Sequence, residues 1–270
     1  MAQHEPLSEE EEKEVEERSA PRAKIVHAAV SKQGEDEMQR PLGSLFWSGV
    51  AAGIAIMASV WAEAGLHHKL AGVPGREALS GLGYTLGFLI VILGRMQLFT
   101  EQTMVPVLPL AKRPTRSNFA RVGRLWGIVF AGNLIGAAAI AAAVAHLHLQ
   151  SEEMTAAMLE ISSRLLEKSP GQMLLQGIPA GFLIASIAWI RSAENENGFW
   201  IVIALTWAIS LGGFTHVIAG AAEAFLLLWT GQVDVGWTLY NFLFPAFVGN
   251  VIGGTGLFAM LAHAQVKEEI

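Results

Sequence analysis

The chain has 270 residues, of which 52% are hydrophobic and only 16% are charged, and its mean hydropathy is +0.42. This composition excludes an ordinary water-soluble domain and is typical of an integral membrane protein. The formal net charge of −6 is unevenly distributed, because residues 1–40 hold eleven acidic and six basic side chains.

The first forty residues form an acidic segment. It contains the run SEEEEKEVEERSA, from Ser8 to Ala20, which has too few apolar side chains to build a core. We expect a cytoplasmic tail over 1–40 that is disordered or partly helical, because the apolar run of a secretory signal is missing before Leu42. The sequence has no cysteine, which excludes disulfides and thiolate chemistry.

Residues 41–265 are expected to form one membrane domain, followed by a short cytoplasmic end over 266–270. A helix needs about 20 largely apolar residues to cross a bilayer. Six charge-free intervals satisfy this approximately: 41–62, 78–94, 125–151, 169–190, 197–222 and 235–266. Two shorter apolar pieces, 102–111 and 224–233, directly follow the second and fifth intervals. They predict six crossings, with the second and fifth helices broken.

The connections between these intervals predict the orientation. Five basic residues gather in the loop between the second and third intervals: Lys112, Arg113, Arg116, Arg121 and Arg124. The loops on the other side hold only Lys69, Arg76, Arg164 and Lys168. Because short cytoplasmic loops are enriched in Lys and Arg, both termini are expected to lie in the cytoplasm. The membrane is expected to be the inner (plasma) membrane of the cell.

Three matches relate the two halves, about 41–150 and 169–265, in the same order. FAGNLIG at 130–136 matches FVGNVIG at 247–253, GVAAG at 49–53 matches GIPAG at 177–181, and Phe99-Thr100 matches Phe214-Thr215. Three spans per half force the second half to start from the opposite side, so an inverted 3+3 repeat is predicted. In such folds the broken helices meet near the midplane beside a polar passage, which places the pathway at the two Phe-Thr pairs.

Glycines are frequent in the matched segments and allow helices to approach closely. They are interpreted as packing residues without solute contact.

At these positions the chain resembles the formate/nitrite transporter family. The motifs that carry the resemblance are Leu98-Phe99-Thr100, Gly213-Phe214-Thr215-His216, FAGNLIG and FLFPAFVGNVIGG at 242–254, and the likeness covers roughly 41–265. It implies an all-α fold with an aquaporin-like protomer, a homopentamer in the lipid bilayer, and a pore in each protomer for small monovalent anions such as formate or nitrite.

The same resemblance assigns roles to individual residues. His216 stands at the central histidine of the family, with Thr100 as its hydroxyl neighbour, and Phe214 and Thr215 complete the second loop. Constriction side chains are implied at five positions, and Phe99 and Phe214 are the stronger candidates for gating. The five positions are Leu98, Phe99, Tyr84, Phe88 and Ile209.

The chain departs from the family pattern at several positions. Gln97 and Thr215 stand where acids precede the two motifs, Gly220 replaces an asparagine, and Gly181 lies where a polar residue is common. Arg95, Glu101 and Glu223 are additional charges at or near membrane depth. These departures affect the expected substrate rather than the expected fold.

Glu101 has two interpretations. If FTE at 99–101 is aligned with FTH at 214–216, Glu101 becomes the counterpart of His216 and would favour its imidazolium form. Alternatively, Glu101 forms an ion pair with Arg95. Glu223 is a second candidate partner for Arg95. The sequence does not choose between them.

An anion channel or transporter, passive or proton-linked through His216, is the function that these features favour. An aquaporin-like channel for neutral solutes and a non-conducting scaffold or sensor remain alternatives, although no Asn-Pro-Ala motif is present. The sequence lacks a zinc-binding HExxH, a GxSxG-like nucleophile site and an aspartyl pair, so no enzymatic activity is expected. Neither a cofactor or metal nor a nucleic-acid partner is expected.

Overall fold

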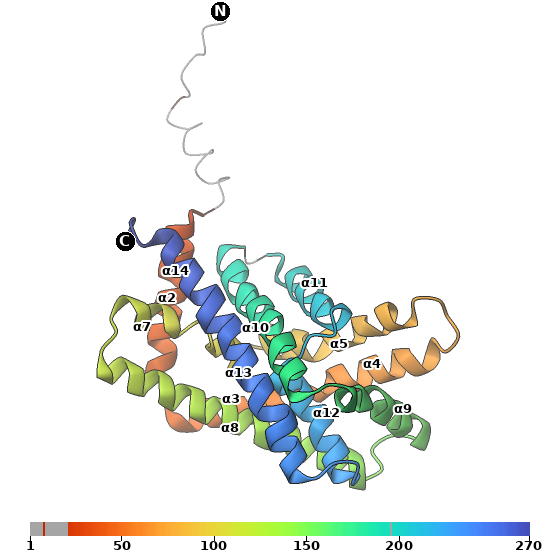
Figure 1. Ribbon diagram of the computed structural model, residues 1–270. Coiled ribbons are helices and arrows are strands. Elements are labelled where there is room, and N and C mark those ends of the chain that lie inside the picture. Colours follow the sequence, from red (N-terminus) through yellow and green to blue (C-terminus); the bar gives the residue numbers. More distant parts are fainter. Residues whose placement is uncertain (1–7, 9–20, 195) are drawn as a thin grey trace, which may run out of the picture.

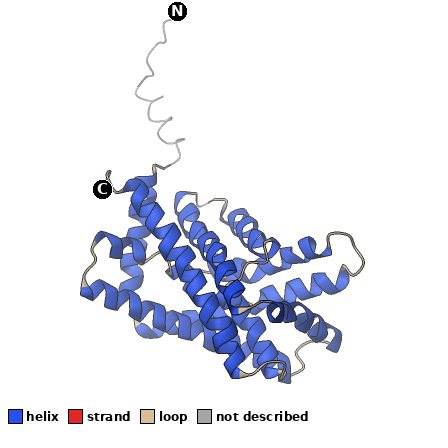
Figure 2. Ribbon diagram, viewed as in Figure 1, coloured by secondary structure: helices blue, strands red, loops and turns tan. Residues whose placement is uncertain are grey.

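The computed structural model describes residue 8 and the ranges 21–194 and 196–270. Within these residues every regular element is a helix and no strand occurs (Figure 2). The predicted all-α architecture is therefore confirmed. Most of the acidic run, residues 9–20, lies outside the described residues.

The helices of the first half begin before the membrane domain, with α2 (Figure 1). Their bounds are α2 Ala23–Gln39, α3 Leu42–Ala55, α4 Met57–Lys69, α5 Arg76–Leu93, α6 Phe99–Gln102, α7 Val107–Lys112 and α8 Arg116–His146. Thr115 caps the start of α8, because its side chain accepts a hydrogen bond from the Asn118 backbone N–H at 3.2 Å.

The second half begins with a short helix that packs against α4 and α12. Its elements are α9 Glu152–Ser162, the 3₁₀ turn η1 Ser163–Glu167, α10 Pro170–Ala193, α11 Gly198–Leu211, α12 Val217–Trp229, the π-helix η2 Trp237–Leu243, α13 Phe244–Val251, the π-helix η3 Ile252–Ala259 and α14 Met260–Val266. A capping box starts α10, because Ser169 and Gln172 each bond the other's backbone N–H.

Five continuous helices in the described part of the chain are long and apolar enough to cross a membrane. They are Leu42–Lys69 (α3 with α4), Arg76–Leu93 (α5), Arg116–His146 (α8), Pro170–Ala193 (α10) and Trp237–Val266 (η2 to α14). The apolar helices α11 and α12 are each shorter, and they follow one another across residues 212–216. These elements occupy the apolar intervals of the sequence, and the fifth interval contains two helices.

The two interruptions, 94–98 and 212–216, contain a left-handed residue at the same place. Arg95 has φ 54° and Gly213 has φ 59°, each two residues beyond the end of the preceding helix. A glycine adopts this conformation without steric cost, whereas a residue with a side chain rarely does. Arg95 is therefore held in an uncommon backbone conformation at the first interruption.

The hydrogen bonds that close the two helix ends are also the same. The N–H of Met96 donates to the carbonyl of Val91 at 2.9 Å, and the N–H of Phe214 donates to the carbonyl of Ile209 at 3.0 Å. This is the wider bond of a Schellman-type helix end. The two interruptions are therefore equivalent at a sequence offset of 118, the difference between Met96 and Phe214.

Glycines bring α3 against α8, and α10 against α13 and η3. A Cβ added at Gly53 would overlap the backbone carbonyl of Asn133, and one at Gly181 would overlap the carbonyl of Asn250. Because no side chain fits there, these helices pack backbone to backbone. The packing role expected for Gly53 agrees with the structure, and Gly181, in the matched GIPAG segment, packs in the same way.

α2 lies on the same face of the molecule as α7 and α14, and we call this side the α2 face (Figure 1). Its apolar residues Val26, Val30 and Met38 are at most 4% exposed. The opposite side carries α9 and the connection between α4 and α5, and we call it the α9 face. α2 and α14, from the first and second halves of the chain, therefore pack together on one face.

Candidate functional site

One asparagine holds the first interruption in place. Asn133 in α8 is fully buried, and its Oδ1 accepts a hydrogen bond from the Phe99 N–H at 2.9 Å. Its Nδ2 donates to the carbonyls of Gly49 and Gln97, each at 2.8 Å. The side chain thus satisfies the first N–H of α6 and a carbonyl of the non-helical segment 94–98 that precedes this helix.

A second asparagine makes the equivalent three bonds at the other interruption. The Oδ1 of Asn250 in α13 accepts from the Val217 N–H at 2.8 Å. Its Nδ2 donates to the carbonyls of Gly177 and Thr215, each at 2.8 Å. The two halves of the molecule therefore repeat one arrangement of side chain and backbone.

These bonds fix the register between the halves. Phe99 and Val217 occupy the same position relative to their asparagines, so Leu98 is the counterpart of His216. The alignment of Glu101 with His216 is therefore wrong by three residues. It followed a shared Phe-Thr pair, whereas the backbone hydrogen bonds follow the helix ends.

The two interruptions meet at a hydrogen bond between Thr100 and His216. The Oγ1 of Thr100 lies 2.7 Å from Nε2 of His216, and the residues are 0% and 2% exposed. The backbone N–H of Ala219 donates to Nδ1 of the same ring at 3.1 Å. Because Nδ1 accepts, the proton of a neutral ring resides on Nε2, which donates to the threonine. His216 is thus oriented as a neutral donor, and its Nδ1 would have to leave Ala219 to take a second proton.

Aromatic rings cover one side of this histidine. The rings of Phe88 and His216 meet edge to face with centroids 5.0 Å apart, and Tyr84 lies 5.1 Å from Phe88. Phe88 is fully buried. Of the constriction side chains implied by the resemblance, α5 therefore brings this pair to the centre.

Leu98 and Phe99 are fully buried at the start of α6. The Phe99 ring stacks on Phe247 at 5.1 Å and meets Phe130 edge to face at 4.9 Å. It also lines an apolar groove of about 600 Å³ between α8 and the segment η2–α13. The ring contacts of Phe99 are thus with α8 and α13, away from the histidine ring.

The remaining implied pathway residues lie at the second interruption. Ile209 is fully buried and Thr215 is 3% exposed. The ring of Phe214 lies over Gly212, where an added Cβ would be 2.6 Å from it. The Thr215 N–H donates to the carbonyl of Gln176 in α10 at 3.1 Å, which ties this loop to a neighbouring span.

The charged residues do not form the ion pairs considered for them. Within the described part of the chain, Arg95 has neither Glu101 nor Glu223 as an ion-pair partner. Glu101 and Arg95 do line one cavity on the α2 face, but the cation that acts most strongly on Glu101 is Arg191. Glu223 is electrostatically coupled to Lys168 and other charges near the α9 face instead.

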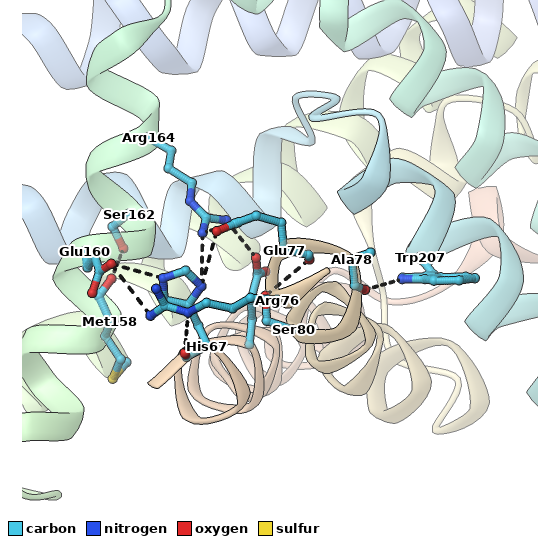
Figure 3. A network of polar contacts seen from close by, with 11 residues as sticks. His67, Arg76, Glu77, Ala78, Ser80, Met158, Glu160, Ser162, Arg164 and Trp207 are labelled. Atoms are coloured by element: carbon cyan, nitrogen blue, oxygen red, sulfur yellow. Dashed lines mark hydrogen bonds and ion pairs between the residues drawn. The ribbon is translucent and has the colours of Figure 1, made fainter. Parts of the chain in front are cut away.

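A network of charges lies on the α9 face (Figure 3). Nε2 of His67 donates to Glu160 Oε1 at 3.0 Å, and Nδ1 of the same ring accepts from Arg164 Nη2 at 3.2 Å. Arg164 also contacts Glu77 at 2.5 Å. The hydrogen bond to His67 lowers the pKa of Glu160. This network joins the end of α4, the start of α5, and the segment α9–η1.

Arg164 extends from this network towards the interior. Its Nη1 lies 3.3 Å from the carboxylate of Glu63, which is 6% exposed. Nearby, Lys168 Nζ donates to the carbonyl of Gly213 in the second interruption at 2.7 Å, and burial lowers the pKa of this lysine. A basic side chain thus contacts the loop that precedes His216. No group of three or more His, Asp or Glu suited to a metal occurs among the described residues.

Sequence reasoning missed Asn133 and Asn250 as site residues. Both lie in the matched GN-x-x-G segments, so the signal was present in the repeat. Two departures from the family pattern also find an explanation here. A Cβ at Gly220 would lie 2.5 Å from the buried ring of Phe242, and Gly181 has no room for a side chain beside Asn250. Polar side chains at these positions are therefore replaced by close packing.

The comparisons with known proteins agree with this architecture. The model of the formate/nitrite transporter family matches residues 24–264. The chain is 37% identical over 255 residues to the inner membrane protein YfdC of Escherichia coli strain K12, covering 94% of this chain and 82% of that protein.

Solved structures share the fold at lower identity. A pentameric formate channel with formate bound superimposes with a TM-score of 0.73 at 20% identity, covering 84% of this chain and 98% of that chain. An ion channel of the FNT family gives a TM-score of 0.75 at 15% identity, covering 90% and 98%. The two equivalent helix interruptions described above thus belong to a fold that is found among channels.

Proposed function

Because the chain belongs to the formate/nitrite transporter family, we propose that it is a membrane channel or transporter for a small monovalent anion of a weak acid. The observation that carries this proposal is the buried hydrogen bond between Thr100 and His216, formed where the two interrupted helices meet. Buried polar groups at membrane depth are costly and mark functional sites by default. Formate and nitrite are the substrate class.

The electrostatics of the interruptions support an anion. An anion that enters the bilayer core loses hydration, so the pathway must supply donors in its place. α12 begins next to His216, and the start of a helix carries partial positive charge. His216 adds an Nε2–H donor that an anion can share with Thr100. A neutral imidazole thus favours an anion without trapping it by full charge.

Proton linkage through His216 requires a change at its other nitrogen. The ring must release the Ala219 N–H before Nδ1 can accept a proton. Proton exchange between a weak-acid anion and the ring therefore requires the hydrogen bond from the Ala219 N–H to be broken. We propose passage of the anion as the basic activity, with proton linkage as its pH-dependent extension.

The relatives support a proposal for the assembly of the protein and for the membrane that holds it. We propose a homopentamer, since one of the structural neighbours is a pentameric formate channel. The relative YfdC is an inner membrane protein, and we place this chain in the same kind of membrane. The five basic residues between α7 and the first turns of α8 favour the α2 face as cytoplasmic, with both termini inside.

Flux into proteoliposomes tests the proposal. Formate, nitrite, acetate and lactate are supplied in turn to wild type and to His216→Ala. Formate or nitrite uptake by the wild type, lowered about tenfold or more in His216→Ala, is expected from the loss of a buried donor. Empty liposomes give the background of uncharged acid that crosses the lipid.

Two outcomes contradict the proposal. If none of the four anions crosses faster than in empty liposomes, the scaffold or sensor function replaces it. If only water or glycerol crosses, the chain is an aquaporin-like channel for neutral solutes. Equal anion uptake by wild type and His216→Ala removes the histidine from the mechanism while leaving transport in place.

A further inference from the structure

An apolar groove of about 600 Å³ lies between α8 and the segment η2–α13. The rings of Phe130 and Phe247 meet in it at 5.1 Å, and the fully buried ring of Phe99 supports both from within. Gly123 and Gly127 line it from α8, and a Cβ added at either glycine would meet no atom within 4 Å. These two glycines therefore leave room beside the helix, whereas the glycines at the helix contacts leave none.

The outer edge of the groove carries exposed apolar side chains. Tyr240 and Phe244 are 73% and 65% exposed, and Leu239 is 45% exposed. Leu239 and Tyr240 belong to η2, and a π-helix is a rare element that occurs mostly at functional sites. These residues lie in the span Trp237–Val266, where hydrocarbon rather than water surrounds a helix. An apolar occupant is therefore expected, and the length of the groove and the charges at its end indicate which.

The groove has the length of one leaflet of a bilayer. Along α8 it extends from Gly123 to Leu134, which is about 16 Å at 1.5 Å of rise per residue. The hydrocarbon core is about 30 Å thick, so one leaflet contributes about 15 Å. Gly123 lies near the basic first turns of α8, and Leu134 lies near the middle of this 31-residue helix. A single acyl chain that enters from the α2 face thus fits the groove from end to end.

An arginine stands at the α2-face end of the groove. Residues three or four apart share one side of a helix, so Arg116 and Ala120 continue the line of Gly123 and Gly127 towards the surface. Arg116 is exposed, and it forms no ion pair within residues 21–194 and 196–270. Its positive charge is therefore available to a group that lies at this end of the groove.

A second hollow, of about 520 Å³, adjoins the same end, and Ala120 lines it together with Ser117, Arg121 and Arg124. Arg124 Nη2 donates to the carbonyl of Met38 at 2.6 Å, which fixes its guanidinium. Arg121 has no ion-pair partner in the described part of the chain. Guanidinium groups are well suited to bind a phosphate, and a hydroxyl group adds a further donor. The apolar groove therefore ends beside phosphate donors whose positive charge no described carboxylate neutralises.

We propose that the groove binds one acyl chain of an anionic phospholipid in the leaflet on the α2 face, with the lipid phosphate at Arg116 and Arg121. A zwitterionic lipid offers the same chain without the net charge, so the arginines favour the anionic lipid. The bound chain packs against Trp126, whose Nε1 donates to the carbonyl of Gln102 at 2.8 Å, at the end of α6. The lipid thus supports the first interruption from the membrane side. This inference goes beyond the proposed transport, and its test needs no flux.

Photo-crosslinking of the full chain in nanodiscs tests the site. The nanodiscs consist of phosphatidylcholine with a trace of phosphatidylglycerol that carries a diazirine at the end of one acyl chain, and labelled peptides are identified by mass spectrometry after illumination. We expect labelled peptides from α8 and from η2–α13. Unlabelled phosphatidylglycerol should displace the label at about one fifth of the concentration that unlabelled phosphatidylcholine requires, because each arginine near the surface favours an anionic lipid.

Variants separate the groove from the charges. Gly127→Leu places a side chain in the open space and is expected to lower the labelling of these peptides about fivefold, through loss of the buried acyl chain. Gly256→Leu is the matched control, since Gly256 is an exposed glycine outside the groove with no atom within 4 Å of an added Cβ. It should be labelled like wild type.

Arg116→Gln and Arg121→Gln should each lower labelling by the phosphatidylglycerol probe about fivefold. Both should leave labelling by a phosphatidylcholine probe with the same diazirine chain unchanged. Lys267→Gln removes an exposed charge on the α2 face away from the groove and is the control for general surface charge. Because Arg116 and Arg121 have no ion-pair partner to lose, neither substitution threatens the fold.

Four outcomes overturn the proposal. Equal displacement by the two unlabelled lipids removes the preference for an anionic headgroup, and equal labelling of wild type and Gly127→Leu places the acyl chain elsewhere. A loss of labelling in Lys267→Gln as large as in Arg116→Gln would leave only general surface charge. Absence of label from the groove, together with an altered oligomer mass in Gly127→Leu, would assign the groove to a neighbouring copy of the chain instead of a lipid.

Discussion

Asn133 and Asn250 make the same three hydrogen bonds in the two halves of the molecule, each accepting from the first N–H of a helix and donating to two backbone carbonyls. Both side chains are fully buried. Each asparagine therefore does for an interrupted helix what water does for an exposed one, in a region where water is scarce.

Asn133→Ala is expected to lower the free energy of unfolding by about 3 kcal/mol or more, because it leaves one N–H and two carbonyls buried without partners. Asn250→Ala is expected to cost a similar amount, since its bonds are equivalent. The measurement is the thermal unfolding midpoint of the detergent-solubilised protein. Asn118→Ala is the control, because this partly exposed asparagine on the same helix makes only one side-chain donor bond, to the Arg113 carbonyl at 2.9 Å. A midpoint for Asn133→Ala equal to that of the control would show that the three hydrogen bonds of Asn133 do not stabilise the fold.

The close approach of helices makes a second prediction. Gly53→Ala and Gly181→Ala should each destabilise the protein by about 1–3 kcal/mol or more, because the added methyl group overlaps a backbone carbonyl that cannot move aside easily. Gly127→Ala is the matched control, since a Cβ there meets nothing within 4 Å. That control should be neutral or slightly stabilising, as alanine favours a helix. Equal midpoints for all three variants would argue against backbone-to-backbone packing.

Much of the architecture followed from the sequence because it rests on local signals. The apolar intervals located the spans. Phe99-Thr100 directly follows the first helix interruption, and Phe214-Thr215 lies inside the second. Bounding each span by charged residues misplaced the start of α8, which begins at Arg116 rather than near Leu125. Its first turns carry basic side chains that α-helical geometry accommodates at a membrane surface. Charge therefore marked the apolar core of this helix, not its end.

The register of the repeat could not be read from residue identities alone. Phe99 and Phe214 are the same residue type, but the hydrogen bonds to the two asparagines make Val217 the equivalent of Phe99. A backbone register depends on which N–H meets which carbonyl, and side-chain identity constrains that only weakly. Likewise, Gln102 and Arg191 are far apart in the chain, and only the folded structure brings them to one cavity.

The bond between Thr100 and His216 yields a third prediction. Thr100→Val keeps the shape of the side chain but removes the oxygen that accepts from the ring, so anion flux should fall about tenfold. Thr100→Ser retains that oxygen and should keep flux within a few-fold of wild type. Initial uptake of formate by proteoliposomes is the measurement, with protein incorporation matched between samples. Equal flux through the valine and serine variants would contradict a role for the hydroxyl in the pathway.

The fourth prediction concerns the contact between α2 and α14. His27 Nε2 lies 3.2 Å from Nδ1 of His263, and Ser31 Oγ lies 3.4 Å from the other nitrogen of His27. Burial lowers the pKa of His27 to about 4, from an ordinary value of 6.5, with further contributions from His263 and Lys112. The folded protein therefore holds this ring neutral, whereas the unfolded chain takes up a proton below pH 6.5.

It follows that the stabilising contact of α2 is complete above pH 6.5 and is lost as the pH falls towards 4. The difference in thermal midpoint between pH 7.5 and pH 5 should be smaller in His27→Gln than in wild type, because glutamine does not titrate. His68→Gln changes an exposed histidine on the other face and should keep the wild-type difference. If His27→Gln loses as much stability on acidification as wild type, other groups cause the acid sensitivity. The decisive quantity is the slope against pH, since the loss of packing in His27→Gln lowers its midpoint at every pH alike.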